Sequence, residues 1–187
     1  PHPPIRVAAT TPETFPVLGR QGYPCFGAVR QGNLTDLIPD IESYRAAWRE
    51  AGHPGEGGVF LRIPIYIAET AERAQDEPKQ SIMEFYRAMG NQLIESSREP
   101  GVGDEEMRRT RGEALLEISY EEVQREKVVI GTPEHVAARL TQLRDDLGIA
   151  GVLAELNCGR NIPHPNVMRS LQLLCTEVMP ALKQVPA

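Results

Sequence analysis

Short apolar runs and helix-start signals alternate along the whole chain, and this alternation limits the available folds more than any other feature. An apolar run over residues 5–9 precedes Thr11-Pro12-Glu13, and another over residues 128–131 precedes Thr132-Pro133-Glu134. A threonine that can cap, a proline suited to the first turn and a glutamate that complements the helix dipole are typical of a helix start. We therefore expect the chain to pass from extended structure into a helix at both places.

The same reading along the rest of the chain predicts a repeated order of strand and helix. Strands are expected over residues 5–9, 23–29, 59–68 and 151–156. Helices are expected to open at Thr11 and to cover about residues 34–50, 70–95, 113–127, 132–147 and 167–182. Pro39 should kink the second helix or delay its start, and Pro180 should end the last one. Residues 96–112, rich in charge and glycine, are expected to form a loop with a short polar helix.

Alternating strands and helices specify an α/β fold in which parallel strands are joined by right-handed crossovers. Four such units form either a small open sheet or half of an eight-stranded barrel, which typically needs about 250 residues. The spacing of the elements alone leaves both architectures open.

Composition excludes several classes of protein. Of the 187 residues, 41% are hydrophobic, which is ordinary for a globular protein and excludes a wholly disordered chain. The 20 basic and 26 acidic residues give a net charge of −6, which argues against a nucleic-acid partner. The most apolar stretch, residues 59–68, is too short to span a bilayer and contains Arg62 and Pro64. The N-terminus shows no secretory signal, so we expect a soluble cytoplasmic protein without membrane contact.

The cysteines and histidines offer no metal site. Cys25, Cys158 and Cys175 are widely spaced and form no C-x-x-C pair, a pattern that suits a reducing compartment. Cys158 is expected to be an ordinary buried thiol. No two histidines have the spacing of metal ligands beside a carboxylate, and His164 between two prolines is expected to order its loop.

Four stretches resemble, in order, parts of the bacterial luciferase-like flavin-dependent monooxygenases. PPIRVAATTPET at residues 3–14, followed by GRQGYP at 19–24, resembles the fifth strand, loop and helix of that family. YRAAWREAGH at residues 44–53 is similar to a helix end of the form Y-R-x-A-x-x-x-A-G-H. IGTPEHV at residues 130–136 is similar to the helix start G-T-P-E-x-V, and residues 162–182 resemble the closing helix, with its E-V-x-P ending.

The resemblance implies a (β/α)8 TIM barrel of which residues 1–187 form the C-terminal half, strands five to eight, with a helical insert after the seventh strand. Residues 96–112 would be a lid within this insert. Four parallel strands without closure leave two bare edges and an uncovered interior. We therefore expect the first half to be absent from this chain or to lie on another chain. We also expect the present half to expose inward-facing apolar side chains, namely Val7, Phe26, Ile65 and Leu153.

The function that the resemblance implies is that of an oxidoreductase, a flavin-dependent monooxygenase. Such an enzyme oxygenates a small organic substrate with O2 and reduced FMN, which a separate flavin reductase supplies, and a homodimer is expected. Two alternatives remain open. One is a deazaflavin-dependent oxidoreductase on the same barrel, and the other is a non-catalytic half-barrel that serves as a binding or assembly module.

Three threonines at the first strand-to-helix passage are the candidate cofactor site. Hydroxyl groups beside the N–H groups of a helix N-terminus form a natural phosphate seat. The resemblance implies that Thr10, Thr11 and Thr14 hold the flavin phosphate there, with Ala9 contributing its backbone. Thr11 is also expected to cap the helix, and Glu13 to complement its dipole. No catalytic residue is identified, because the resemblance places the family's imidazole in the other half of the barrel.

Overall fold

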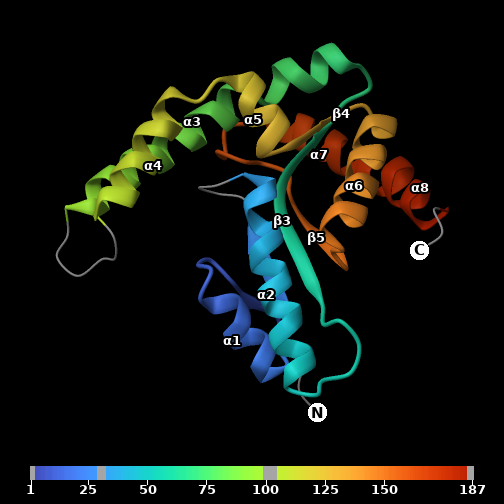
Figure 1. Ribbon diagram of the computed structural model, residues 1–187. Helices are drawn as coiled ribbons and strands as arrows, with labels where there is room; N and C mark the ends of the chain where they lie inside the picture. Colours follow the sequence, from blue (N-terminus) through green and yellow to red (C-terminus); the bar gives the residue numbers. More distant parts are fainter. Residues whose placement is uncertain (1–2, 29–32, 99–104, 185–187) are drawn as a thin grey trace. The chain divides into compact units, whose positions relative to one another are not determined.

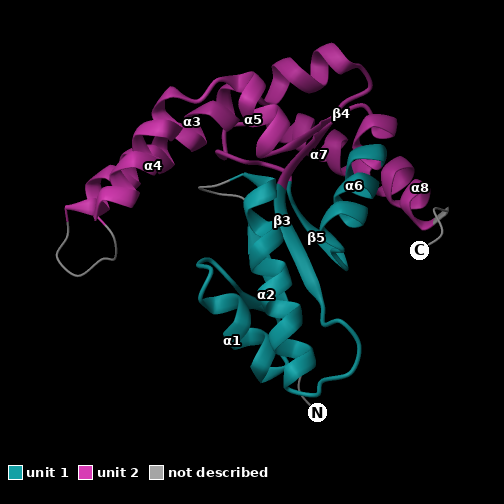
Figure 2. Ribbon diagram, in the orientation of Figure 1, with its two compact units in different colours: residues 1–63, 138–155 teal, residues 64–137, 156–187 magenta. Residues whose placement is uncertain are grey.

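The computed structural model describes residues 3–28, 33–98 and 105–184 (Figure 1). The chain divides into two compact units, each made of two segments (Figure 2). Unit 1 contains residues 1–63 and 138–155, and unit 2 contains residues 64–137 and 156–187. Within the described part of the chain, no helix combines the length and the apolar character needed to cross a bilayer.

Unit 1 is built on a parallel sheet. Its strands are β1 (Val7–Ala8), β2 (Cys25–Ala28), the first part of β3 (Val59–Ile67) and β5 (Gly151–Glu155). β1 pairs in parallel with β2, β2 pairs in parallel with β3, and β5 pairs with β3 on its other side. These are the four strands expected from the sequence, although Val29 lies outside the described residues.

The helices of unit 1 follow its strands in the expected order. They are α1 (Thr14–Gln21), the short 3₁₀ turn η1 (Leu34–Asp36), α2 (Leu37–Glu50) and the second part of α6 (Pro133–Leu147). Pro39 lies in the first turn of α2, where its missing N–H group breaks no intrahelical bond, so the predicted delay of the helix start is confirmed. α1 and α2 lie side by side (Figure 1) because Gly19 has no side chain: a Cβ there would be 2.3 Å from the Tyr44 carbonyl oxygen.

The two faces of the unit 1 sheet differ in what covers them. One face packs against α1 and α2, where the backbone of Gly27 faces Phe15 and Leu37. The buried strand residues on this face are Cys25, Val59, Leu61 and Ile63. The opposite face, which we call the open face, carries the half-buried Phe26 and Phe60.

Of the four side chains that were expected to be inward-facing and exposed, Val7 and Ile65 are placed differently. Leu153 is 42% exposed, and Phe26 lies on the open face. Val7 pairs with the buried Cys25 and so belongs to the covered side, which corrects the expectation for this residue. Ile65 is only 1% exposed, so the expectation of an exposed side chain at this position was also wrong.

Unit 2 contains the second part of β3, which pairs in parallel with β4 (Val129–Gly131). Residues 128–131 were not among the four expected strands, so β4 is an addition. The helices are α3 (Ala71–Ser97), α4 (Glu105–Glu117), α5 (Tyr120–Glu126), α7 (His164–Leu173) and α8 (Met179–Gln184), with a π-helical turn η2 (Leu174–Val178) before α8. The core of unit 2 gathers apolar residues from these elements and from the segments next to them, among them Tyr66, Ala74, Ile82, Tyr86, Leu93, Leu115, Val123, Val128 and Ile162.

The insert expected over residues 96–112 is more helical than predicted. Residues 99–104 lie outside the described part, and the rest belongs to the end of α3 and to α4. α4 packs along α3 through Gly90 and Gly112, where a Cβ on either residue would lie 2.8 Å from the carbonyl oxygen of the other. The single helix expected over residues 113–127 is also wrong, because Ser119 interrupts it and its hydroxyl caps α5 by accepting from the Glu122 N–H.

The closing helix continues past Pro180, which therefore does not end it as expected. α7 passes into η2, and α8 then begins at Met179. A proline within a helix removes one N–H donor and crowds the preceding turn. The wider π-helical turn immediately before Pro180 is a local adjustment of the kind that accommodates such a residue.

Candidate functional site

The predicted phosphate residues lie together at the carboxyl end of β1. The hydroxyl oxygens of Thr11 and Thr14 are 3.0 Å apart and hydrogen-bonded. Thr10 and Thr11 are exposed and Thr14 is half-buried. Ala9 is 3% exposed and its N–H donates to the Phe26 carbonyl oxygen at 2.8 Å, so its N–H is already bonded within the sheet.

The start of α1 differs from the expected capped start. The residue before the helix is Glu13, and no side chain caps the helix, so the prediction that Thr11 is the N-cap was wrong. A turn precedes the helix instead: the N–H of Thr14 donates to the carbonyl of Thr11 at 3.0 Å, and that of Phe15 to Pro12 at 3.3 Å. Because backbone carbonyls satisfy these donors, the side-chain hydroxyls are the main donors left for a ligand.

A carboxylate lies beside these hydroxyls. Hydrogen bonds from its own backbone N–H and from the Thr11 side chain lower the pKa of Glu13. Glu13 is the residue immediately before α1, so the predicted interaction of its carboxylate with the helix dipole stays a prediction. A bound phosphate would have to compete with Glu13 for the Thr11 hydroxyl. The neighbouring hydroxyls of Thr11 and Thr14 are a donor set that fits a phosphate group when Glu13 releases the Thr11 hydroxyl.

An ion pair crosses the open face of the unit 1 sheet. Arg62 of β3 donates from Nε to Glu155 Oε2 at 3.2 Å, and its Nη2 lies 3.1 Å from Oε1. Such two-point contacts fix the plane of the guanidinium group. In the sequence, Arg62 stands out only as an interruption of an apolar stretch. The period-two alternation of β3, which puts Arg62 on the same face as Phe60, is the signal that could have identified it.

Aromatic side chains lie next to this ion pair on the open face. The rings of Phe26 and Phe60 have centroids 5.5 Å apart, and the Arg6 guanidinium carbon lies 4.3 Å from the centre of the Phe60 ring. Along the strands, the open face therefore has two successive rows of side chains. The two rings form an apolar row, which we call the apolar level, and Arg62 and Glu155 form a polar row, which we call the polar level.

The cysteines and His164 lie outside the threonine turn. Cys158 is buried, as expected, and its carbonyl accepts from the Ser81 hydroxyl at 2.6 Å. Burial also raises the pKa of the Cys25 thiol to about 11, which makes it a poor nucleophile. His164 begins α7. In the ranges that the structure describes, no group of three or more His, Cys, Asp or Glu side chains has an arrangement suited to a metal ion.

Unit 2 holds a polar network that the sequence analysis missed. Glu77 on α3 accepts hydrogen bonds from the Tyr66 hydroxyl, from Arg169 and, at 2.9 Å, from Arg73 Nε. Burial opposes the ionisation of Glu77, but the bonds from Tyr66 and Arg73 and the charge of Arg169 outweigh it and lower its pKa. Burial, together with the bond to Glu77, raises the pKa of Tyr66. The network ties β3 to α3 and α7 and leaves its tyrosine protonated.

Comparison with known proteins gives a family and a set of folds. A sequence profile of the luciferase-like monooxygenases matches residues 1–150. No curated protein matches the chain. Among solved structures, the FMN-bound oxygenating constituent of 3,6-diketocamphane monooxygenase from Pseudomonas putida is 20% identical with a TM-score of 0.69, over 96% of this chain and 49% of that one.

Two further solved structures are a reductase and another monooxygenase. The coenzyme F420-dependent tetrahydromethanopterin reductase from Methanopyrus kandleri is 18% identical with a TM-score of 0.63, over 96% of this chain and 51% of that one. EDTA monooxygenase from Chelativorans sp. BNC1 is 20% identical with a TM-score of 0.62, over 97% of this chain and 44% of that one. The chain thus spans about half the length of these proteins, and the predicted α/β fold of TIM-barrel type is confirmed. The match over residues 1–150 shows that the chain belongs to the luciferase-like monooxygenase family.

Proposed function

We propose that this protein is a flavin-dependent monooxygenase that oxygenates a small organic substrate with O2 and reduced FMN. The observation that supports this most directly is the hydrogen-bonded hydroxyl pair of the exposed Thr11 and the half-buried Thr14, placed where β1 ends and α1 begins, in a chain of this family. The carboxyl ends of barrel strands are where such enzymes build their sites.

The contribution of this chain is to bind and orient the cofactor. Thr10, Thr11 and Thr14 donate hydroxyl hydrogen bonds to its phosphate, and the burial of Ala9 fixes the strand end from which they project. When bound, reduced FMN supplies the electrons for the reaction with O2, and the protein supplies orientation and exclusion of water. A separate flavin reductase provides the reduced cofactor, and the active protein is a cytoplasmic homodimer.

A deazaflavin-dependent oxidoreductase is the second candidate. It is favoured by the structural similarity to the coenzyme F420-dependent reductase, which is almost as extensive as the similarity to the FMN-bound oxygenase. Such an enzyme would transfer a hydride and consume no O2.

The absorbance spectrum of the protein as purified at its natural full length, followed by reconstitution with FMN and with a deazaflavin, tests the proposal. We expect FMN to bind and, with a flavin reductase and reduced nicotinamide supplied, substrate-dependent O2 consumption. Tight binding of the deazaflavin alone would favour the second candidate. Binding of neither cofactor would contradict both.

A further inference from the structure

The polar level of the open face lies at the carboxyl edge of the unit 1 sheet. Ala28, the last residue of β2, is paired with Arg62 of β3, and Arg62 is bonded to Glu155, the last residue of β5. On the other side, Ala8 is paired with Phe26, and the bond from the Ala9 N–H to Phe26 extends this register. When this register is extended two residues past the end of β1, Thr10 comes level with Ala28. One row therefore runs across the sheet: Thr10, Ala28, Arg62 and Glu155.

Arg62 presents unused donors in a fixed orientation. Its Nε and Nη2 are engaged by Glu155, whereas its Nη1 makes no hydrogen bond within the described residues. The side chain of Arg62 is 38% exposed and that of Glu155 is 25% exposed, so the pair is accessible from the open face. A planar guanidinium group held at two points offers its remaining N–H groups with little loss of side-chain entropy.

The spacing along this row suits an elongated ligand. Thr10 and Arg62 are two strands apart, which corresponds to about 10 Å. The small side chain of Ala28 lies between them in this row, and the neighbouring rings of Phe26 and Phe60 are on the same face of the sheet. A ligand with an anionic end at the threonine hydroxyls could therefore place a flat, acceptor-bearing ring at Arg62. The five-carbon ribityl chain of FMN separates its phosphate from its ring system by a comparable length.

We propose that Arg62, positioned by Glu155, donates from Nη1 to the pyrimidine edge of the flavin and binds the reduced form more tightly than the oxidised form. Reduced flavin carries its negative charge on this edge, and a hydrogen bond from a charged donor strengthens as charge accumulates on the acceptor. Arg62 is thus a cofactor-contacting residue and Glu155 a positioning residue. The inference rests on the proposed flavin function and names the residue that adjusts the cofactor's potential.

The experiment measures the affinity of the full-length protein for oxidised and for reduced FMN, together with the midpoint potential of the bound flavin. Arg62→Met should weaken the binding of reduced FMN about tenfold more than that of oxidised FMN, which lowers the two-electron midpoint potential by about 30 mV. Arg49→Met is the matched control, because Arg49 also pairs with a glutamate, Glu56, at 3.1 Å, but on an exposed surface. It should leave both affinities and the potential unchanged.

Two further variants separate the donor from its neighbour's charge. The double variant Arg62→Met/Glu155→Met removes the carboxylate that the single variant leaves unpaired, and it should keep the lowered potential. Glu155→Gln keeps the cation and should not lower the potential. If the double variant regained the wild-type potential, the effect would come from the unpaired Glu155 and the proposal would be wrong.

The failure of this inference is distinguishable from the failure of the proposed function. If FMN bound and Arg62→Met behaved like Arg49→Met, Arg62 would have no role toward the flavin, and the flavin function would stand. If the full-length protein bound neither FMN nor a deazaflavin, both proposals would be wrong. The denaturant midpoint of each variant should match that of the wild type. A large drop in the midpoint for Arg62→Met alone would mean that the ion pair serves to stabilise the fold.

Discussion

Thr11 and Thr14 hold their hydroxyl oxygens 3.0 Å apart on a turn that backbone hydrogen bonds already close. Removing the Thr11 hydroxyl should therefore affect the ligand rather than the fold. We expect Thr11→Ala to lose one charge-assisted hydrogen bond to phosphate, worth about 1.5–3 kcal/mol, and to weaken FMN binding about tenfold to a hundredfold. The free energy of unfolding should change by less than about 0.5 kcal/mol, because Thr11 caps no helix.

Fluorescence titration with FMN, beside a denaturant melt, measures both quantities, and Thr11→Ser is the control that retains the hydroxyl. Unchanged FMN affinity in Thr11→Ala would mean that the phosphate binds at another place than this turn. A large loss of stability would instead restore the capping role that the sequence predicted.

At the scale of the elements, Glu77 is the acceptor that joins β3, α3 and α7 in unit 2. Its side chain is 18% exposed. We expect Glu77→Gln to lower the free energy of unfolding by about 1.5–3 kcal/mol at neutral pH, since it replaces charge-assisted bonds with weaker ones. Glu72→Gln, on the exposed first turn of the same helix, should have little effect.

The effect of Glu77 should depend on pH in a defined direction. Because its pKa is lowered in the folded protein, its stabilisation is complete above the unfolded-state pKa of about 4.3 and is lost as the pH falls through the folded-state value. The wild type should therefore lose stability in acid faster than Glu77→Gln, and the two should converge. Denaturant melts between neutral and acidic pH measure this. Parallel curves for the two proteins would contradict the assignment.

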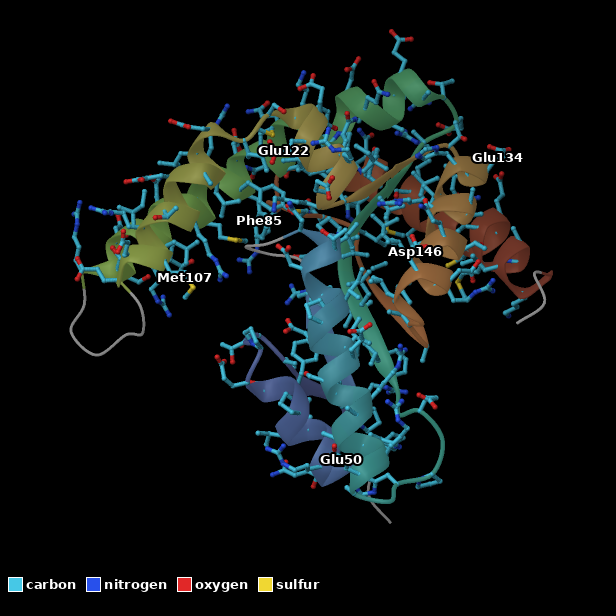
Figure 3. All side chains as sticks on the ribbon, in the orientation of Figure 1. Glu50, Phe85, Met107, Glu122, Glu134 and Asp146 are labelled. Carbon is cyan, nitrogen blue, oxygen red and sulfur yellow. The ribbon has the colours of Figure 1, made fainter. Side chains whose placement is uncertain are left out.

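The helical insert is the second test at this scale. α4 carries the exposed Met107 and Leu116 (Met107 is labelled in Figure 3) and rests on α3 through Gly90 and Gly112. We expect residues 96–112 to act as a lid, so that amide hydrogen exchange in their described part, residues 105–112, slows when FMN binds. Exchange in the core of α2 is the internal control. Equal, strong protection with and without FMN would mean a rigid structural insert, and equally fast exchange would mean a segment with no part in the reaction.

Local signals in the sequence predicted elements well where a single cause determines the structure. Thr132-Pro133-Glu134 predicts α6, which begins at Pro133, and Thr70 accepts from the Arg73 N–H at the start of α3. The similar signal at Thr11 predicted a side-chain cap that does not form, because backbone carbonyls accept the N–H groups that such a cap would bind. The strand pairing of β4 depends on contacts far apart in sequence, which periodicity does not reveal.

The candidate site was only half predictable for the same reason. The three threonines lie close together in the chain, so they can be recognised as a group from the sequence alone. The pair formed by Arg62 and Glu155 joins residues 93 positions apart, and only the register of β3 and β5 brings them together. The residues that one loop supplies could therefore be predicted, whereas the pair that the strand register brings together could not.

At the scale of the molecule, the open face of unit 1 predicts association. It carries Phe26, Phe60 and the 42% exposed Leu153, and in a closed barrel these residues would face the interior. We expect residues 1–187, expressed alone, to form dimers or larger assemblies in size-exclusion chromatography with light scattering. Replacing Leu153 with Lys should shift the population toward the monomer. A cooperative monomer of the unaltered chain would contradict the half-barrel account and favour an open sheet.

The central claim is that the threonine turn at the end of β1 binds the phosphate of a flavin, and the most direct measurement compares FMN with riboflavin, which lacks only the phosphate. Titrating the full-length protein with both, we predict that FMN binds at least about tenfold more tightly, as expected for the loss of charge-assisted hydrogen bonds. The preference should shrink when Thr11 and Thr14 are both replaced by Ala. Equal affinity for FMN and riboflavin, or no binding of either, would contradict the account.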